Sequence, residues 1–95
     1  MDKILNNLGL AQRASALITG EEMVIAGIQA GNVCYIFLAQ DAGRSTYKKI
    51  TDKAKFYQIE VNTSYSSEDL SHAIGKANRK VIGVVKKEFL KILKK

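Results

Sequence analysis

Residues that could support catalysis are few, and they form no catalytic or metal-binding motif. His72 is the single histidine and Cys34 the single cysteine, which excludes a zinc site built from these two residue types. Gly75-Lys76 could end a phosphate-binding loop, but that motif requires a glycine where Leu70 stands. Asp41 follows an apolar segment, where α/β proteins place functional carboxylates, although aspartate is also a common turn residue. Because no second catalytic group can be named beside Asp41, we predict a protein that is not an enzyme and binds no metal or cofactor.

Charge is unevenly distributed along the sequence. Residues 1–74 contain seven lysines and arginines and eight acidic residues, whereas residues 75–95 contain eight basic residues and one acidic residue. A one-sided positive field attracts polyanions, and nucleic acids are the commonest large polyanions in a cytosol. The alternative is that a lysine-rich C-terminal helix only provides a solvated surface. Charge alone therefore indicates RNA or DNA binding without establishing it.

Length and composition predict one globular domain that covers residues 1–95. The chain is 46% hydrophobic and 25% charged, which matches an ordinary folded protein, and it has no proline. A single cysteine excludes an internal disulfide framework and suits a reducing compartment. No apolar run approaches the ~18 residues of a membrane span, and the N-terminal residues lack the pattern of a signal peptide. We therefore expect a cytoplasmic protein with no membrane association.

Helical and strand patterns alternate along the chain, which predicts an α/β class. Helical spacing of apolar residues occurs at 2–14, 20–31, 43–57 and 66–75, and again in a closing helix that contains residues 89–93. Apolar runs at 33–39 and 81–85 predict buried strands, and residues 59–61 predict a short one. Residues 15–19 are expected to be a short link. This order predicts a three-layer α-β-α sandwich around a small central mixed sheet.

Local signals mark several helix ends. Asp2 and Ser66 stand where N-caps are expected, and Thr19 is the expected N-cap of the second helix. Gly31 suits the position just after the same helix ends. A methionine such as Met23, near the beginning of this helix, more often lies in the core than contacts a ligand.

Three polar loops are expected to meet at related ends of the strands, at residues 19–22, 41–46 and 62–69. Free backbone N–H groups at residues 20–23, where the second helix begins, can bind phosphate or a base edge. Glu21 and Glu22 could accept hydrogen bonds from base amino groups, or they could only stabilise the positive end of the helix.

Several segments in register resemble the ribosomal protein L7Ae family. They are GEE at 20–22 with the helix through Gly31, VCYIFLAQD at 33–41 and LSHAIG at 70–75. LGLAQRA at 8–14, Ser45-Thr46 followed by Lys48-Lys49, and Thr51-Asp52-Lys53 are typical of the bacterial YlxQ-like branch of this family. The resemblance covers nearly the whole chain and implies an α-β-α RNA-binding domain.

The resemblance also implies recognition of kink-turns, which are sharply bent RNA helices with tandem sheared G·A pairs beside a three-nucleotide bulge. By position in the sequence, RNA contacts are then expected from two loops and from basic residues that hold the backbone. The implied RNA-binding residues are Arg13, Gly20, Glu21, Glu22, Met23, Arg44, Lys48, Lys49, Tyr65, Ser66, Ser67, Glu68 and Lys76. The implied partners are kink-turn or ribosomal RNA and the ribosome. We expect the protein to be a monomer.

The sequence departs from the family pattern at the start of the second helix. Glu22, Met23 and Ala26 stand where the family has asparagine, glutamate and lysine. Since asparagine and lysine read guanine acceptors, binding of a related bent RNA through the basic residues is an alternative. Tyr65 could stack on an unpaired base or pack on its own domain. A protein-interaction subunit that docks on a ribonucleoprotein or translation factor, without specific RNA readout, is the second functional hypothesis.

Overall fold

A four-stranded mixed sheet forms the centre of the structure, a computed structural model that describes residues 2–94. Its strands are β1 (Leu17–Thr19), β2 (Tyr35–Leu38), β3 (Val61–Asn62) and β4 (Val81–Val84), in the order β1-β4-β2-β3. β4 is antiparallel to both β1 and β2, and β2 is parallel to β3. The last strand in the sequence therefore lies in the interior of the sheet.

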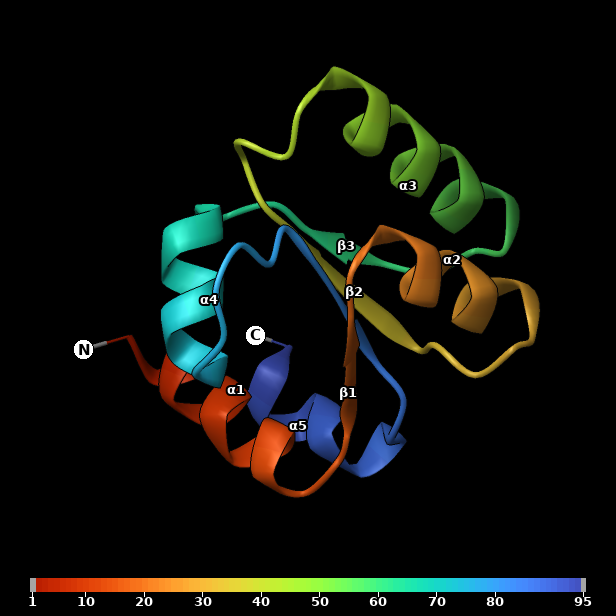
Figure 1. The fold of residues 1–95 in the computed structure, drawn as a ribbon. Helices are drawn as coiled ribbons and strands as arrows, with labels where there is room; N and C mark the ends of the chain where they lie inside the picture. Colours follow the sequence, from red (N-terminus) through yellow and green to blue (C-terminus); the bar gives the residue numbers. More distant parts are fainter. Residues whose placement is uncertain (1, 95) are drawn as a thin grey trace.

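Helices cover both faces of this sheet (Figure 1). One face carries α2 (Glu21–Gln29) and α3 (Arg44–Phe56), and the other carries α1 (Lys3–Arg13), α4 (Ser67–Ile74) and α5 (Leu90–Leu93). A short 3₁₀ turn, η1 (Lys87–Phe89), precedes α5. The expected three-layer α-β-α sandwich with a small mixed sheet is confirmed.

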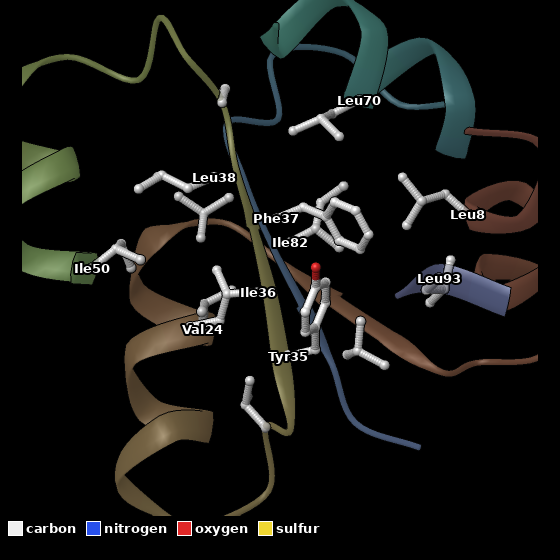
Figure 2. Close-up of a cluster of buried hydrophobic side chains, with 14 of the residues drawn as sticks. Leu8, Val24, Tyr35, Ile36, Phe37, Leu38, Ile50, Leu70, Ile82 and Leu93 are labelled. Carbon is white, nitrogen blue, oxygen red and sulfur yellow. The ribbon is translucent and has the colours of Figure 1, made fainter. Parts of the chain in front are cut away.

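The central strand β2 contributes buried side chains to both faces of the sheet. All four of its residues are buried, as an uninterrupted apolar run predicts for a strand covered on both faces. Alternate side chains point to opposite faces, so Ile36 and Leu38 lie toward α2 and α3 while Tyr35 and Phe37 lie toward α1, α4 and α5 (Figure 2). The rings of Tyr35 and Phe37 meet edge to face with centroids 5.3 Å apart.

The structure corrects the expected elements in three places along the chain. Residues 15–19 are not merely a link, because Leu17 to Thr19 form the edge strand β1 against β4. The third strand lies at Val61–Asn62 rather than at 59–61, and the closing segment divides into η1 and a four-residue α5.

The expected caps are right at two helices and wrong at a third. Asp2 accepts the N–H groups of Ile4 and Leu5 at α1, and Ser66 accepts the N–H of Asp69 at α4. Thr19 does not cap α2, because Gly20 occupies the N-cap with φ +94° and ψ 149°, and no side chain caps this helix. That backbone conformation is nearly restricted to glycine.

Candidate nucleic-acid interface

The three polar loops meet at one end of the sheet, as expected from the sequence. β1 and β2 are both antiparallel to β4, and β3 is parallel to β2. The carboxyl ends of β1, β2 and β3 therefore lie at the same end of the sheet. We call this end of the sheet, with residues 19–23, 39–46 and 62–68, the loop end. Two backbone hydrogen bonds hold the loop end together. Gln40 N–H donates to the Tyr65 carbonyl at 2.9 Å and joins the second loop to the third, and Gly20 N–H donates to the Val81 carbonyl at 3.0 Å and joins the first loop to β4.

Three helices begin at the loop end. β1 leads into α2, β2 leads through residues 39–43 into α3, and β3 leads through residues 63–66 into α4. Gly20 and Gly43 are the N-caps of α2 and α3, have closely similar backbone angles and provide no side-chain cap. The N-terminal N–H groups of these two helices are therefore not bound by an N-cap side chain, and the helix dipoles make this edge favourable for anions.

Glu21 connects α2 to α3. Thr46 Oγ1 donates to Glu21 Oε1 at 2.6 Å, and Lys49 Nζ donates to Glu21 Oε2 at 3.2 Å. These bonds, first from Thr46 and then from Lys49, hold the pKa of the Glu21 carboxyl below its ordinary value. Both oxygens thus have partners within the protein, so Glu21 braces two helices. Sequence reasoning missed Thr46, whose partner lies 25 residues away and leaves no local signal.

Glu22 and Met23 are exposed next to the start of α2. Met23 is 60% exposed, so of the two alternatives for this residue, core or RNA contact, the core is wrong. The buried residues of α2 are Val24, Gly27 and Ile28, which turn Met23 toward solvent. The exposed pair therefore presents one carboxylate and one flexible apolar side chain beside the free N–H groups of α2.

Asp41 joins the end of β2 to the start of α4. The N–H and hydroxyl of Ser67 donate to the two carboxylate oxygens of Asp41 at 2.7 and 2.6 Å. These bonds, led by the one from the hydroxyl, lower the pKa of Asp41. The hydroxyl of Ser66 accepts the N–H of Asp69 at 3.1 Å. Ser66 and Ser67 therefore hold the loop in shape through their side chains.

Tyr65 packs on its own domain. Its ring lies 6.4 Å from that of Phe37, measured between centroids, and its hydroxyl donates to Asp2 Oδ2 at 2.9 Å. Burial, and then the hydrogen bond to Asp2, raise the pKa of Tyr65 to about 12. The tyrosine thus anchors the loop after β3 to the start of α1.

Basic side chains reach the loop end mainly from α3. Arg44 and Lys48 are exposed in its first two turns, and Lys48 forms an exposed ion pair with Asp52 at 2.8 Å. Lys76 is exposed in the segment that follows α4. Arg13 is not brought together with Arg44 and Lys48, because it ends α1, which covers the opposite face of the sheet from α3.

The part of the chain that the structure describes lacks both a membrane-spanning helix and a cluster of metal ligands. None of the helices within residues 2–94 is long and apolar enough to cross a membrane. Over the same residues, no group of three or more His, Cys, Asp or Glu side chains is arranged to hold a metal ion.

Comparison with known proteins gives consistent matches over nearly the whole chain. The model of the ribosomal protein L7Ae/L30e/S12e/Gadd45 family matches residues 2–94. RNA-binding protein YlxQ of Enterococcus faecium is 42% identical over 89 residues, which cover 94% of this chain and 85% of that protein. RNA-binding protein YlxQ of Bacillus subtilis (strain 168) is 37% identical over 82 residues, covering 86% of this chain and 82% of that protein.

Solved structures share the fold. A protein of unknown function from Bacillus halodurans C superimposes with a TM-score of 0.93 at 45% identity, covering 98% of this chain and 94% of that one. The Giardia lamblia 15.5kD RNA binding protein superimposes with a TM-score of 0.80 at 12% identity, covering 96% of this chain and 78% of that one. At that identity the second likeness concerns the fold alone.

Proposed function

Because the chain belongs to the ribosomal protein L7Ae/L30e/S12e/Gadd45 family, we propose that it is a non-enzymatic RNA-binding protein. The names of its relatives in Enterococcus faecium and Bacillus subtilis support RNA as the ligand. The RNA is structured and bent, of the kink-turn type, and belongs to the ribosome or to a ribosome-associated particle. The protein acts by capturing a bent shape that free RNA populates only in part.

The meeting of helix N-termini at the loop end is the observation that carries this proposal. Uncapped N–H groups at the starts of α2 and α3 can donate to phosphate or base acceptors, and both helix dipoles favour negative charge there. Arg44 and Lys48, which line a hollow with Gln40, and Lys76, which lines another with Ser67 and Glu68, add positive charge to the same region and hold the RNA backbone. Lys49 acts indirectly, since its ammonium group supports Glu21.

Glu22 and Met23 are the residues that give base selectivity in this proposal. The carboxylate of Glu22 can accept hydrogen bonds from base amino groups but not donate to guanine acceptors. Met23 can pack its flexible thioether against an unstacked base. Gly20 contributes by letting the chain turn sharply into α2. Tyr65, Ser66, Ser67 and Glu68 contribute through the shape of the loop that would face the bulge.

The test compares a kink-turn duplex with a control duplex whose two G·A pairs are changed to Watson–Crick pairs, at ~150 mM salt. We expect affinity in the tens of nanomolar range and a preference of ~100-fold, which corresponds to about 2.7 kcal/mol. Equal, weak and salt-sensitive binding to both duplexes would contradict shape recognition. It would favour a protein partner on a ribonucleoprotein instead.

Charge variants locate the interface. Arg44→Gln and Lys48→Gln should each weaken binding to both duplexes and lower the salt dependence by about one unit of slope. Lys91→Gln in α5, on the opposite face of the sheet from α3, is the matched control and should leave both quantities unchanged. An unchanged salt slope in all three variants would remove α3 from the interface.

A further inference from the structure

Two aromatic rings stand exposed together where α3 ends. The side chain of Phe56 is 78% exposed and that of Tyr57 is 40% exposed. The two rings meet edge to face, with centroids 5.0 Å apart and planes at 75°. In this arrangement each ring supports the orientation of the other, while most of the Phe56 ring remains accessible to a ligand.

A groove between α2 and α3 leads to these rings. It has a volume of about 590 Å³ and is lined by Ile25, Lys49, Asp52, Lys53, Phe56 and Tyr57. Figure 1 shows α3 as the outermost helix of its face, with α2 beside it. The groove thus combines apolar side chains with the ammonium group of Lys53, which are the two kinds of contact that a nucleotide strand requires.

The charges of α3 favour an anionic occupant. This helix carries Arg44 and four lysines but a single carboxylate, Asp52, which pairs with Lys48. Lys53 and Lys55 form no ion pair within residues 2–94. Of these two lysines, Lys53 lines the groove. An apolar protein segment in the groove would leave its ammonium group without an anionic partner, whereas a phosphate backbone would supply one.

The groove and the loop end lie along the same helix, α3. α3 has 13 residues, a length of roughly 20 Å, and it runs from Arg44 at the loop end to Phe56. The contact of Glu21 with Thr46 and Lys49 lies at the loop end of the same helix pair, and Lys49 also lines the groove. A strand that leaves RNA bound at the loop end can therefore follow α3 directly to the aromatic rings.

We propose that the groove between α2 and α3 binds a single-stranded RNA segment that flanks the structured RNA. Phe56 stacks on an unpaired base, Tyr57 supports the ring of Phe56, and Lys53 contacts phosphate. Stacking reads the face of a base rather than its edge, so this site accepts any sequence and prefers an unpaired strand. The flanking position rests on the proposed function of the loop end, while the single-strand site is argued from α2 and α3 alone.

The first experiment measures binding of a blunt kink-turn duplex and of the same duplex with an extension of about six uridines at the 5′ or the 3′ end. One of the extended duplexes should bind about tenfold more tightly than the blunt one. Phe56→Ala and Phe56→Leu should abolish that gain, and Phe56→Tyr should retain it. Leu10→Ala, which removes an exposed apolar side chain from α1, is the control that keeps the gain.

The outcomes separate this inference from other uses of the groove. If neither extension improves binding by the wild-type protein, the inference is overturned. If Phe56→Leu keeps the full gain, stacking is refuted and a simple apolar contact remains, as for a docked protein segment. Circular dichroism of each variant verifies the fold, which substitution of a side chain this exposed should not change.

A second experiment keeps the inference testable if the kink-turn preference fails. Oligouridine of about ten nucleotides is titrated alone at low salt, with tyrosine fluorescence as the signal, because the chain contains no tryptophan. Binding that is lost in Phe56→Ala and Phe56→Leu supports the single-strand site even without kink-turn recognition. Tight kink-turn binding without any effect of Phe56 on either single-strand probe overturns the site and leaves the proposed function intact.

Discussion

The hydroxyl of Ser71 gives the sharpest test of how the loop after α4 is held. Ser71 is buried, and its Oγ accepts the N–H of Arg79 at 2.7 Å and donates to the carbonyl of the same residue at 3.2 Å. Ser71→Ala removes both bonds and leaves a partly buried N–H without its partner, a loss of roughly 2–3 kcal/mol. The higher helix propensity of alanine returns about 0.5 kcal/mol. We therefore expect the free energy of unfolding to fall by about 2 kcal/mol.

Urea unfolding followed by circular dichroism measures this loss. For a slope of about 1.3 kcal/mol per molar urea, the midpoint should fall by about 1.5 M with the slope unchanged. Ser45→Ala is the matched control, because Ser45 is exposed in the first turn of α3, and its midpoint should stay within the range of a surface substitution. Amide exchange at Arg79 should accelerate only in Ser71→Ala. A midpoint equal to that of the control would refute the role of the hydroxyl.

Three further predictions concern the loop end. Gly20→Ala should lower the unfolding free energy by about 2 kcal/mol, since alanine is strained at φ +94° and ψ 149°, and thermal unfolding measures this loss. The lowered pKa of Asp41 means that its carboxylate stabilises the fold at neutral pH and stops doing so as pH falls through that pKa. Asp41→Asn should therefore be less stable than wild type at pH 7 by urea unfolding, and a difference that persists in strong acid would contradict this assignment. The pKa of Tyr65, raised to about 12, means that the neutral phenol stabilises the fold below pH ~10 and that this contribution is lost as pH rises through 12. Tyr65→Phe should remove the step near pH 12 from an ultraviolet titration of the phenols, and an unchanged titration would refute the raised pKa.

Features set by nearby residues could be predicted from the sequence. Asp2 and Ser66 cap their helices through backbone N–H groups two or three residues away, so the sequence pattern contains the whole interaction. The central strand was equally clear, because a run without polar residues fits only a position covered on both faces. The order of helices and strands followed from these signals.

Features that depend on distant partners could not be predicted. Leu17 to Thr19 is a three-residue, half-buried strand whose pairing depends on residues 82–84, and three residues are too few to establish an alternation. The role of Glu21 depends on Thr46 and Lys49, which its own surroundings in the sequence do not reveal. The place of Met23 could not be decided, because Met23, Val24 and Ile25 are consecutive apolar residues of α2 that cannot all lie on its buried face, and only packing decides which of them does.

The interior position of β4 has a consequence for the order in which the molecule can assemble during synthesis. β1 and β2 do not pair with each other. Thr19 and Phe37 both pair with Ile82 of β4, which is translated more than forty residues after Phe37. Until that segment leaves the ribosome, the emerging chain has two strands with open edges and apolar faces. Closing the loops between these strands costs conformational entropy, and only pairing with β4 supplies the contacts that offset this cost. Nascent chains that stop before residue 81 should therefore remain unfolded, and the fold should appear in a single late step.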